Sequence, residues 1–124
     1  MIRYAMLALG GALGSIARYQ VTTCLQQRVA AGFPWGTFLV NISGCLVMGI
    51  VTTLLTERVV TNPQWRFLIP IGFIGAYTTF STFELDIFNA GSEGAWLIAG
   101  AYIVGSVVAG YLALWAGVVV ARLV

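Results

Sequence analysis

The 124-residue sequence contains very few charged side chains, and it has neither histidine nor lysine. Charged residues make up 8% of the chain and hydrophobic residues 60%, against about 25% and about 45–50% in soluble domains. A soluble domain of this size could not bury so much apolar surface, so a soluble enzyme is nearly excluded. Without histidine the chain lacks the commonest general base and metal ligand, and without clustered basic charge it is not expected to bind nucleic acid. The composition therefore predicts an integral membrane protein that is not an enzyme.

The few charges divide the chain into apolar segments of membrane-spanning length. Two uncharged windows, 29–56 and 94–121, each have room for a transmembrane helix of about 20 residues. Tryptophans near most of the expected helix ends match an interfacial aromatic belt. We therefore expect an all-α integral membrane protein with one domain over 1–124. Its four transmembrane helices are predicted near 3–28, 35–56, 66–89 and 95–121.

The third of these segments does not read as a continuous helix. Pro70, Gly72 and Gly75 weaken it, and threonines and a serine that compete for backbone hydrogen bonds follow them. We expect a break near 75–79, where freed carbonyl groups could hold a small cation and a new helix N-terminus could attract an anion. A packing kink without such a role remains an alternative.

Several polar and aromatic residues within the apolar segments are candidate site residues. Asn41 lies deep in the second segment, where an amide must be hydrogen-bonded, and Thr37 shares its face. Arg18 is the one charge deep in the first segment, and it either marks a watery cavity or extends to the interface. Phe80 and Phe83 share a helix face and could present their positive ring edges to an anion, or they could simply pack.

Small residues recur four positions apart in the expected helices, as in Gly10 and Gly14, Ala101 and Gly105, and Ser106 and Gly110. This spacing lets helix backbones approach closely in a membrane. Packing within one subunit is favoured over a dimer seam for any single pair.

Three blocks of the sequence closely resemble the small bacterial fluoride channels of the Fluc (CrcB) family. They read GGALGSIARY at 10–19, GTFLVNISG at 36–44 and GFIGAYTTFSTF at 72–83. The resemblance implies a fluoride-selective channel that passively exports fluoride across the bacterial cytoplasmic (inner) membrane and reduces its toxicity. It also implies an antiparallel, dual-topology homodimer of multi-pass subunits, embedded in the lipid bilayer and enclosing two pores.

The same resemblance assigns roles to individual residues. It implies that backbone carbonyls of Gly75 and Thr78 hold a structural Na⁺ at the dimer centre. Arg18 matches the family's vestibule arginine. The pore positions are matched by Asn41, Phe80 and Phe83, and the family's track of hydroxyl groups by Thr37, Ser81, Thr82, Tyr102 and Ser106.

Two other functions and one conflict remain open. A proton-coupled small multidrug-type transporter would need an acid inside the membrane, but the first acid, Glu57, is expected in a loop. A non-transporting membrane assembly subunit is the other alternative. The conflict concerns orientation, because Arg3, Arg58, Arg66 and Arg122 would share one side of the membrane and favour one orientation over dual insertion.

Overall fold

A computed structural model describes residues 1–29, 32–57 and 62–124, and every regular element in those residues is helical. Helix α1 spans Ile2–Arg28, α2 spans Trp35–Glu57 and α5 spans Trp96–Leu123. Between α2 and α5 in the sequence lies an interrupted helical segment, which we call the third leg. It consists of the π-helix η1 (Phe67–Ile74), the short helix α3 (Gly75–Tyr77) and helix α4 (Phe80–Ser92). The predicted all-α class is confirmed, and the predicted bounds lie within a few residues of these.

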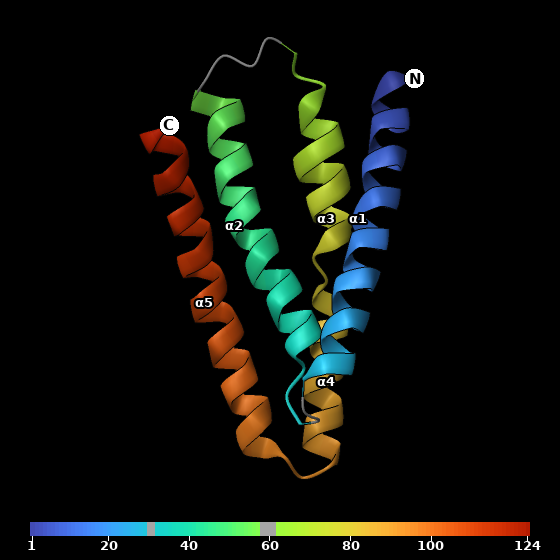
Figure 1. Cartoon of the computed structure of the whole chain (residues 1–124), viewed down its shortest axis with the longest axis vertical. Coiled ribbons are helices and arrows are strands. Elements are labelled where there is room, and N and C mark those ends of the chain that lie inside the picture. The colour runs from blue at the N-terminus through green and yellow to red at the C-terminus, as the bar shows by residue number, and fades with distance from the viewer. Residues whose placement is uncertain (30–31, 58–61) are drawn as a thin grey trace.

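Within the described residues the elements form four long helical segments, or legs: α1, α2, the interrupted third leg and α5. They are arranged in two pairs. Figure 1 shows α1 beside the leg of η1 and α3, and α2 beside α5, with both termini at the same end of the molecule. The α4–α5 connection lies at the opposite end (Figure 1). Large apolar side chains cover the outer faces and are exposed, among them Leu13, Ile16, Leu97, Val104 and Tyr111. Surfaces of this kind suit lipid rather than water.

Two described helices, α2 and α5, are long and apolar enough by themselves to cross a membrane. The other two predicted spans do not meet that measure. Helix α1 is long enough, but its second half carries Ser15, Arg18 and Gln20, which lower its hydropathy. The third leg is interrupted at Thr78–Thr79, so none of its pieces reaches the required length.

The pair α2 and α5 is packed so closely that backbone meets backbone. An added Cβ on Gly117 would overlap the carbonyl oxygen of Leu46, and one on Gly49 would overlap that of Leu114. Only glycine permits such an approach, which brings backbone dipoles and Cα–H groups of two membrane helices into contact.

Helices α1 and η1 also approach each other backbone to backbone, at Gly10 and Gly14, which are four positions apart. An added Cβ on Gly10 would overlap the Leu68 carbonyl oxygen, and one on Gly14 that of Phe73. Element η1 is a π-helix containing the buried Pro70, whose ring cannot fit beneath a normal α-helical hydrogen bond. These two glycines therefore pack within one chain, as the sequence favoured.

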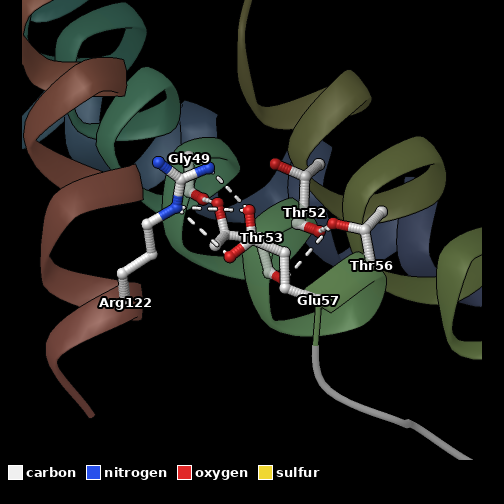
Figure 2. A network of polar contacts seen from close by, with 6 residues as sticks. All are labelled: Gly49, Thr52, Thr53, Thr56, Glu57 and Arg122. Atoms are coloured by element: carbon white, nitrogen blue, oxygen red, sulfur yellow. Dashed lines mark hydrogen bonds and ion pairs between the residues drawn. The ribbon is translucent and has the colours of Figure 1, made fainter.

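The ends of α2 and α5 are joined by an ion pair. In Figure 2 the guanidinium of Arg122 lies against the carboxylate of Glu57, with Nη2 2.6 Å from Oε1 and Nε 3.2 Å from both oxygens. Helix α2 thus includes Glu57, which the sequence had suggested for a loop. Both side chains are largely exposed, so the pair fixes geometry more than it adds stability.

Candidate functional site

The third leg changes direction at two extended residues between α3 and α4. Thr78 has φ −77° and ψ 156°, and Thr79 has φ −148° and ψ 118°, so neither continues the helix. Thr79 caps α4: its hydroxyl accepts from the Thr82 N–H at 3.4 Å and donates to the Thr82 hydroxyl at 3.0 Å. The leg restarts as a helix with its first peptide N–H groups facing the extended residues.

Asn41 of α2 satisfies the backbone at this break. Its Oδ1 accepts from the Thr79 N–H at 2.8 Å, and its Nδ2 donates to the Thr79 carbonyl at 3.1 Å. The Thr79 N–H must face an oxygen, so this pairing also fixes which way the amide points. Within the described residues the second N–H of Nδ2 has no partner, and it remains available to a ligand.

A cavity of about 320 Å³ lies beside the break; we call it the small cavity. Its lining combines polar groups with large apolar ones: Asn41, Gly44, Cys45, Met48, Ile74, Thr78, Thr79, Phe80, Phe83, Ser106, Val107 and Leu114. Among the described residues no charged side chain lines it. A ligand there would meet uncharged polar groups, aromatic rings and aliphatic side chains.

Ser106 is the polar group of α5 in the small cavity. Its hydroxyl oxygen is buried and has no hydrogen-bond partner within the described part of the chain. Serines and threonines in membrane helices usually bond back to their own helix, as Thr53 and Thr56 do in Figure 2. An unpaired buried hydroxyl is costly, which sets Ser106 apart from the other hydroxyl-bearing residues that line the small cavity.

The two predicted pore phenylalanines have very different surroundings in one subunit. Phe83 is 8% exposed and its ring lies 4.9 Å from that of Tyr102, whereas Phe80 is 72% exposed. The two rings are 5.8 Å apart and tilted by 39°, and both line the small cavity. The exposed Phe80 therefore marks a side of the small cavity that a single subunit leaves open.

A second cavity, of about 690 Å³, also borders Thr79; we call it the large cavity. It contains three of the predicted site residues, Arg18, Thr37 and Thr82. Thr79 lines both cavities and is itself only 8% exposed. The residue that caps α4 therefore borders both spaces.

The acids in the large cavity were not assigned any role from the sequence. Asp86 and Glu93 both line it, as does Arg18, the one cation among its described lining residues. Asp86 also accepts a hydrogen bond from the hydroxyl of Tyr102 at 3.4 Å. Asp86 lies on α4 and Glu93 directly follows its last residue, so the two acids are seven positions apart, a spacing that could have indicated this shared position.

The remaining predicted site residues lie outside both cavities. Ser81 is exposed, and Tyr102 is 1% exposed between Phe83 and Phe33, at ring distances of 4.9 and 5.3 Å. Thr79 was not among the predicted site residues. It lies three residues before Thr82 at the start of a helix, and this N-cap spacing could have identified it.

Backbone oxygens are the groups at the break that could hold a cation. Among the described residues no three His, Cys, Asp or Glu side chains lie close enough to bind a metal ion. The carbonyl of Gly75 would bond the Thr79 N–H in a continuous helix, but that N–H binds Asn41 instead. The carbonyl of Thr78 likewise receives none of the backbone hydrogen bonds that connect the described elements. Both oxygens therefore fit a carbonyl-lined cation site.

The fold and the neutral cavity at the break are those of a small helical membrane protein with a candidate permeation site. A family model described as CrcB-like protein, Camphor Resistance (CrcB), matches residues 5–118. The chain belongs to this family.

Full-length relatives carry a more specific name. A protein of Solibacter usitatus named Fluoride-specific ion channel FluC is 48% identical over 98% of this chain and 99% of its own length. Proteins with the same name from Acidobacterium capsulatum and Maridesulfovibrio salexigens are 45% and 41% identical, over 96% and 100% of this chain and 95% and 98% of their own lengths.

Proposed function

We propose that this protein is a fluoride-selective channel, not an enzyme, and that it lets fluoride leave a bacterial cell passively. The observation that carries the proposal is the small cavity. Asn41, which has one spare N–H, Ser106, whose hydroxyl is unpaired, and Phe83 all line it, and among the described residues no charged side chain does. The relatives' names add support, because the similarity extends over the whole chain.

The chemistry of the small cavity suits a small, strongly hydrated anion. Such an ion enters a narrow path only if protein donors replace its water, and it leaves only if no site holds it too strongly. Amide and hydroxyl donors meet both conditions, and the positive edges of aromatic rings add weak attraction. A lysine in the narrow part would bind the ion more tightly, and the chain has no lysine.

The two cavities suggest a route for the ion. Fluoride would enter the large cavity, where Arg18 offers it a cation beside the acids Asp86 and Glu93, and pass Thr37 and Thr82 to reach Thr79, which lines both cavities. Beyond Thr79 it would meet Asn41, Phe83, Phe80 and Ser106. Ser81 and Tyr102 belong to the proposed hydroxyl track, Tyr102 through its contact with Phe83 and Ser81 through a partner subunit.

We further propose that the functional unit is an antiparallel homodimer in the bacterial inner membrane, each subunit crossing it four times. The exposed Phe80 leaves the small cavity open on one side, as expected of a pore that a second copy completes. Two antiparallel copies would bring their breaks together at a two-fold axis. Four neutral oxygens, from Gly75 and Thr78 of each copy, would then suit a structural Na⁺ better than a divalent ion, which calls for carboxylates.

Purified protein in liposomes tests the proposal directly. Liposomes loaded with fluoride or with chloride would be diluted into ion-free buffer, and an ion-selective electrode would follow the release of each. Rapid fluoride release with little chloride release is the expected result. Equal release of the two anions would refute selectivity, and no release from correctly folded protein would favour an assembly subunit.

A further inference from the structure

Helix α2 contacts three consecutive residues at the end of α3, not only Thr79. Asn41 binds the backbone of Thr79, and Gly44 leaves room for the Thr78 methyl group, which an added Cβ would overlap. Ser43 completes the series, because its Oγ lies 2.9 Å from the hydroxyl of Tyr77. The position of the break therefore depends on side chains of a neighbouring helix.

The direction of the Tyr77–Ser43 hydrogen bond follows from the other contacts of Ser43. The Ser43 hydroxyl lies 2.7 Å from the Leu39 carbonyl and 3.1 Å from the Val40 carbonyl, and both can only accept. Its single proton is used there, so the Tyr77 hydroxyl donates to Ser43 Oγ. The result is a chain of two hydrogen bonds from Tyr77 through Ser43 to Leu39, in which each bond strengthens the other.

The rest of Tyr77 is also held. Its ring stacks on that of Phe73, with centroids 6.0 Å apart and planes 8° from parallel. On the other side, an added Cβ on Gly14 of α1 would come within 3.1 Å of the Tyr77 nitrogen. The ring and backbone of Tyr77 are thus confined between neighbouring residues, while its hydroxyl connects α3 to α2.

We propose that Tyr77 is a positioning residue for the cation site at the break. It lies between Gly75 and Thr78, so its hydrogen bond to Ser43 fixes the last turn of α3 and with it the direction of both carbonyl groups. Without that bond, Thr78 can return to helical geometry and the Thr79 N–H can leave Asn41 for the Gly75 carbonyl. The Gly75 oxygen would then be lost to the cation. The inference rests on the proposed Na⁺ site and adds the residue that orients it.

The test measures how much Na⁺ the channel needs. Tyr77→Phe keeps the stacked ring and removes only the hydroxyl, and Ser43→Ala removes the acceptor. Each variant would be depleted of Na⁺ in liposomes, and fluoride release would be measured as Na⁺ is restored. We expect the half-maximal Na⁺ concentration to rise about two- to tenfold in each, the range of one net hydrogen bond. The double variant should be no worse than either single variant, because both changes break the same contact.

Tyr111→Phe is the matched control, since it removes the same hydroxyl from an exposed tyrosine of α5 that lines neither cavity. It should keep the Na⁺ response of the unmodified protein. If Tyr77→Phe does not fold, Ser43→Ala alone carries the test. An unchanged Na⁺ response in the folded variants would overturn the inference and leave the Na⁺ site standing. Fluoride release that is independent of Na⁺ in the unmodified protein would refute the Na⁺ site and the inference together.

Discussion

Gly14 should be among the least replaceable residues of α1, because it lies directly against the backbone of the interrupted leg. A Cβ added there would overlap the Phe73 carbonyl oxygen and come within 3.0 Å of the Phe73 carbonyl carbon and 3.1 Å of the Tyr77 nitrogen. All three are backbone atoms that cannot rotate away. Relief of the overlap therefore requires α1 to move off η1 and α3 by roughly 1 Å, at the expense of the surrounding van der Waals contacts.

We expect Gly14→Ala to destabilise the fold by about 1–3 kcal/mol, the usual range for overpacking a tight contact. Because the displaced atoms include the Tyr77 nitrogen, fluoride release should fall as well. Thermal unfolding in detergent and fluoride release from liposomes would be measured on the same preparations.

Gly11→Ala is the matched control, since an added Cβ on Gly11 has no other atom within 4 Å. It makes the same chemical change one turn away on the same helix, and it should leave stability and fluoride release nearly unchanged. If Gly14→Ala proves as stable and as active as Gly11→Ala, the close backbone contact between α1 and the interrupted leg does not hold in the membrane.

Three further predictions follow from the proposed function. Phe83→Ile and Phe80→Ile should each preserve folding and dimer formation but sharply reduce fluoride release, because Ile keeps the bulk and lacks a positive ring edge. Normal release by both variants would contradict the ring-edge role. Long depletion of Na⁺ should abolish fluoride release and its return should restore it, whereas full activity after verified depletion would rule out a structural Na⁺. Reporters fused to the C-terminus should be active on both sides of the membrane, and activity on one side alone would contradict the antiparallel dimer.

The four legs could be predicted from the sequence because charge and turn residues mark their ends. Their internal geometry could not. Pro70 indicates a weakened helix, but whether the backbone bends or widens into a π-helix depends on α1 packing against it through Gly10 and Gly14. Spacing identified those two glycines, yet the closest contacts of α2 with α5 use Gly49 and Gly117, which lie outside the pairs that spacing selected.

Predictions for the site were limited in a similar way. Asn41 stood out as a buried amide, but its partner, Thr79, is 38 residues away and no local pattern connects them. From the sequence, Arg18 either marked a watery cavity or extended to the interface. The structure places it in the lining of the large cavity together with Asp86 and Glu93, so acids outnumber it among the described residues there. These neighbours depend on which helix faces meet, and that is decided by the packing of the whole fold.

The Asn41 amide links the structure of the break to the proposed passage of the anion. Its oxygen and one of its N–H groups hold the backbone of Thr79 in the extended geometry that keeps the leg interrupted. That use leaves one N–H on a residue that lines the small cavity, as does Ser106 with its unpaired hydroxyl. A permeating anion can therefore gain and lose this donor without the break being remade, because the two contacts with Thr79 persist. A site that keeps its shape while it exchanges its ligand is what rapid passage requires.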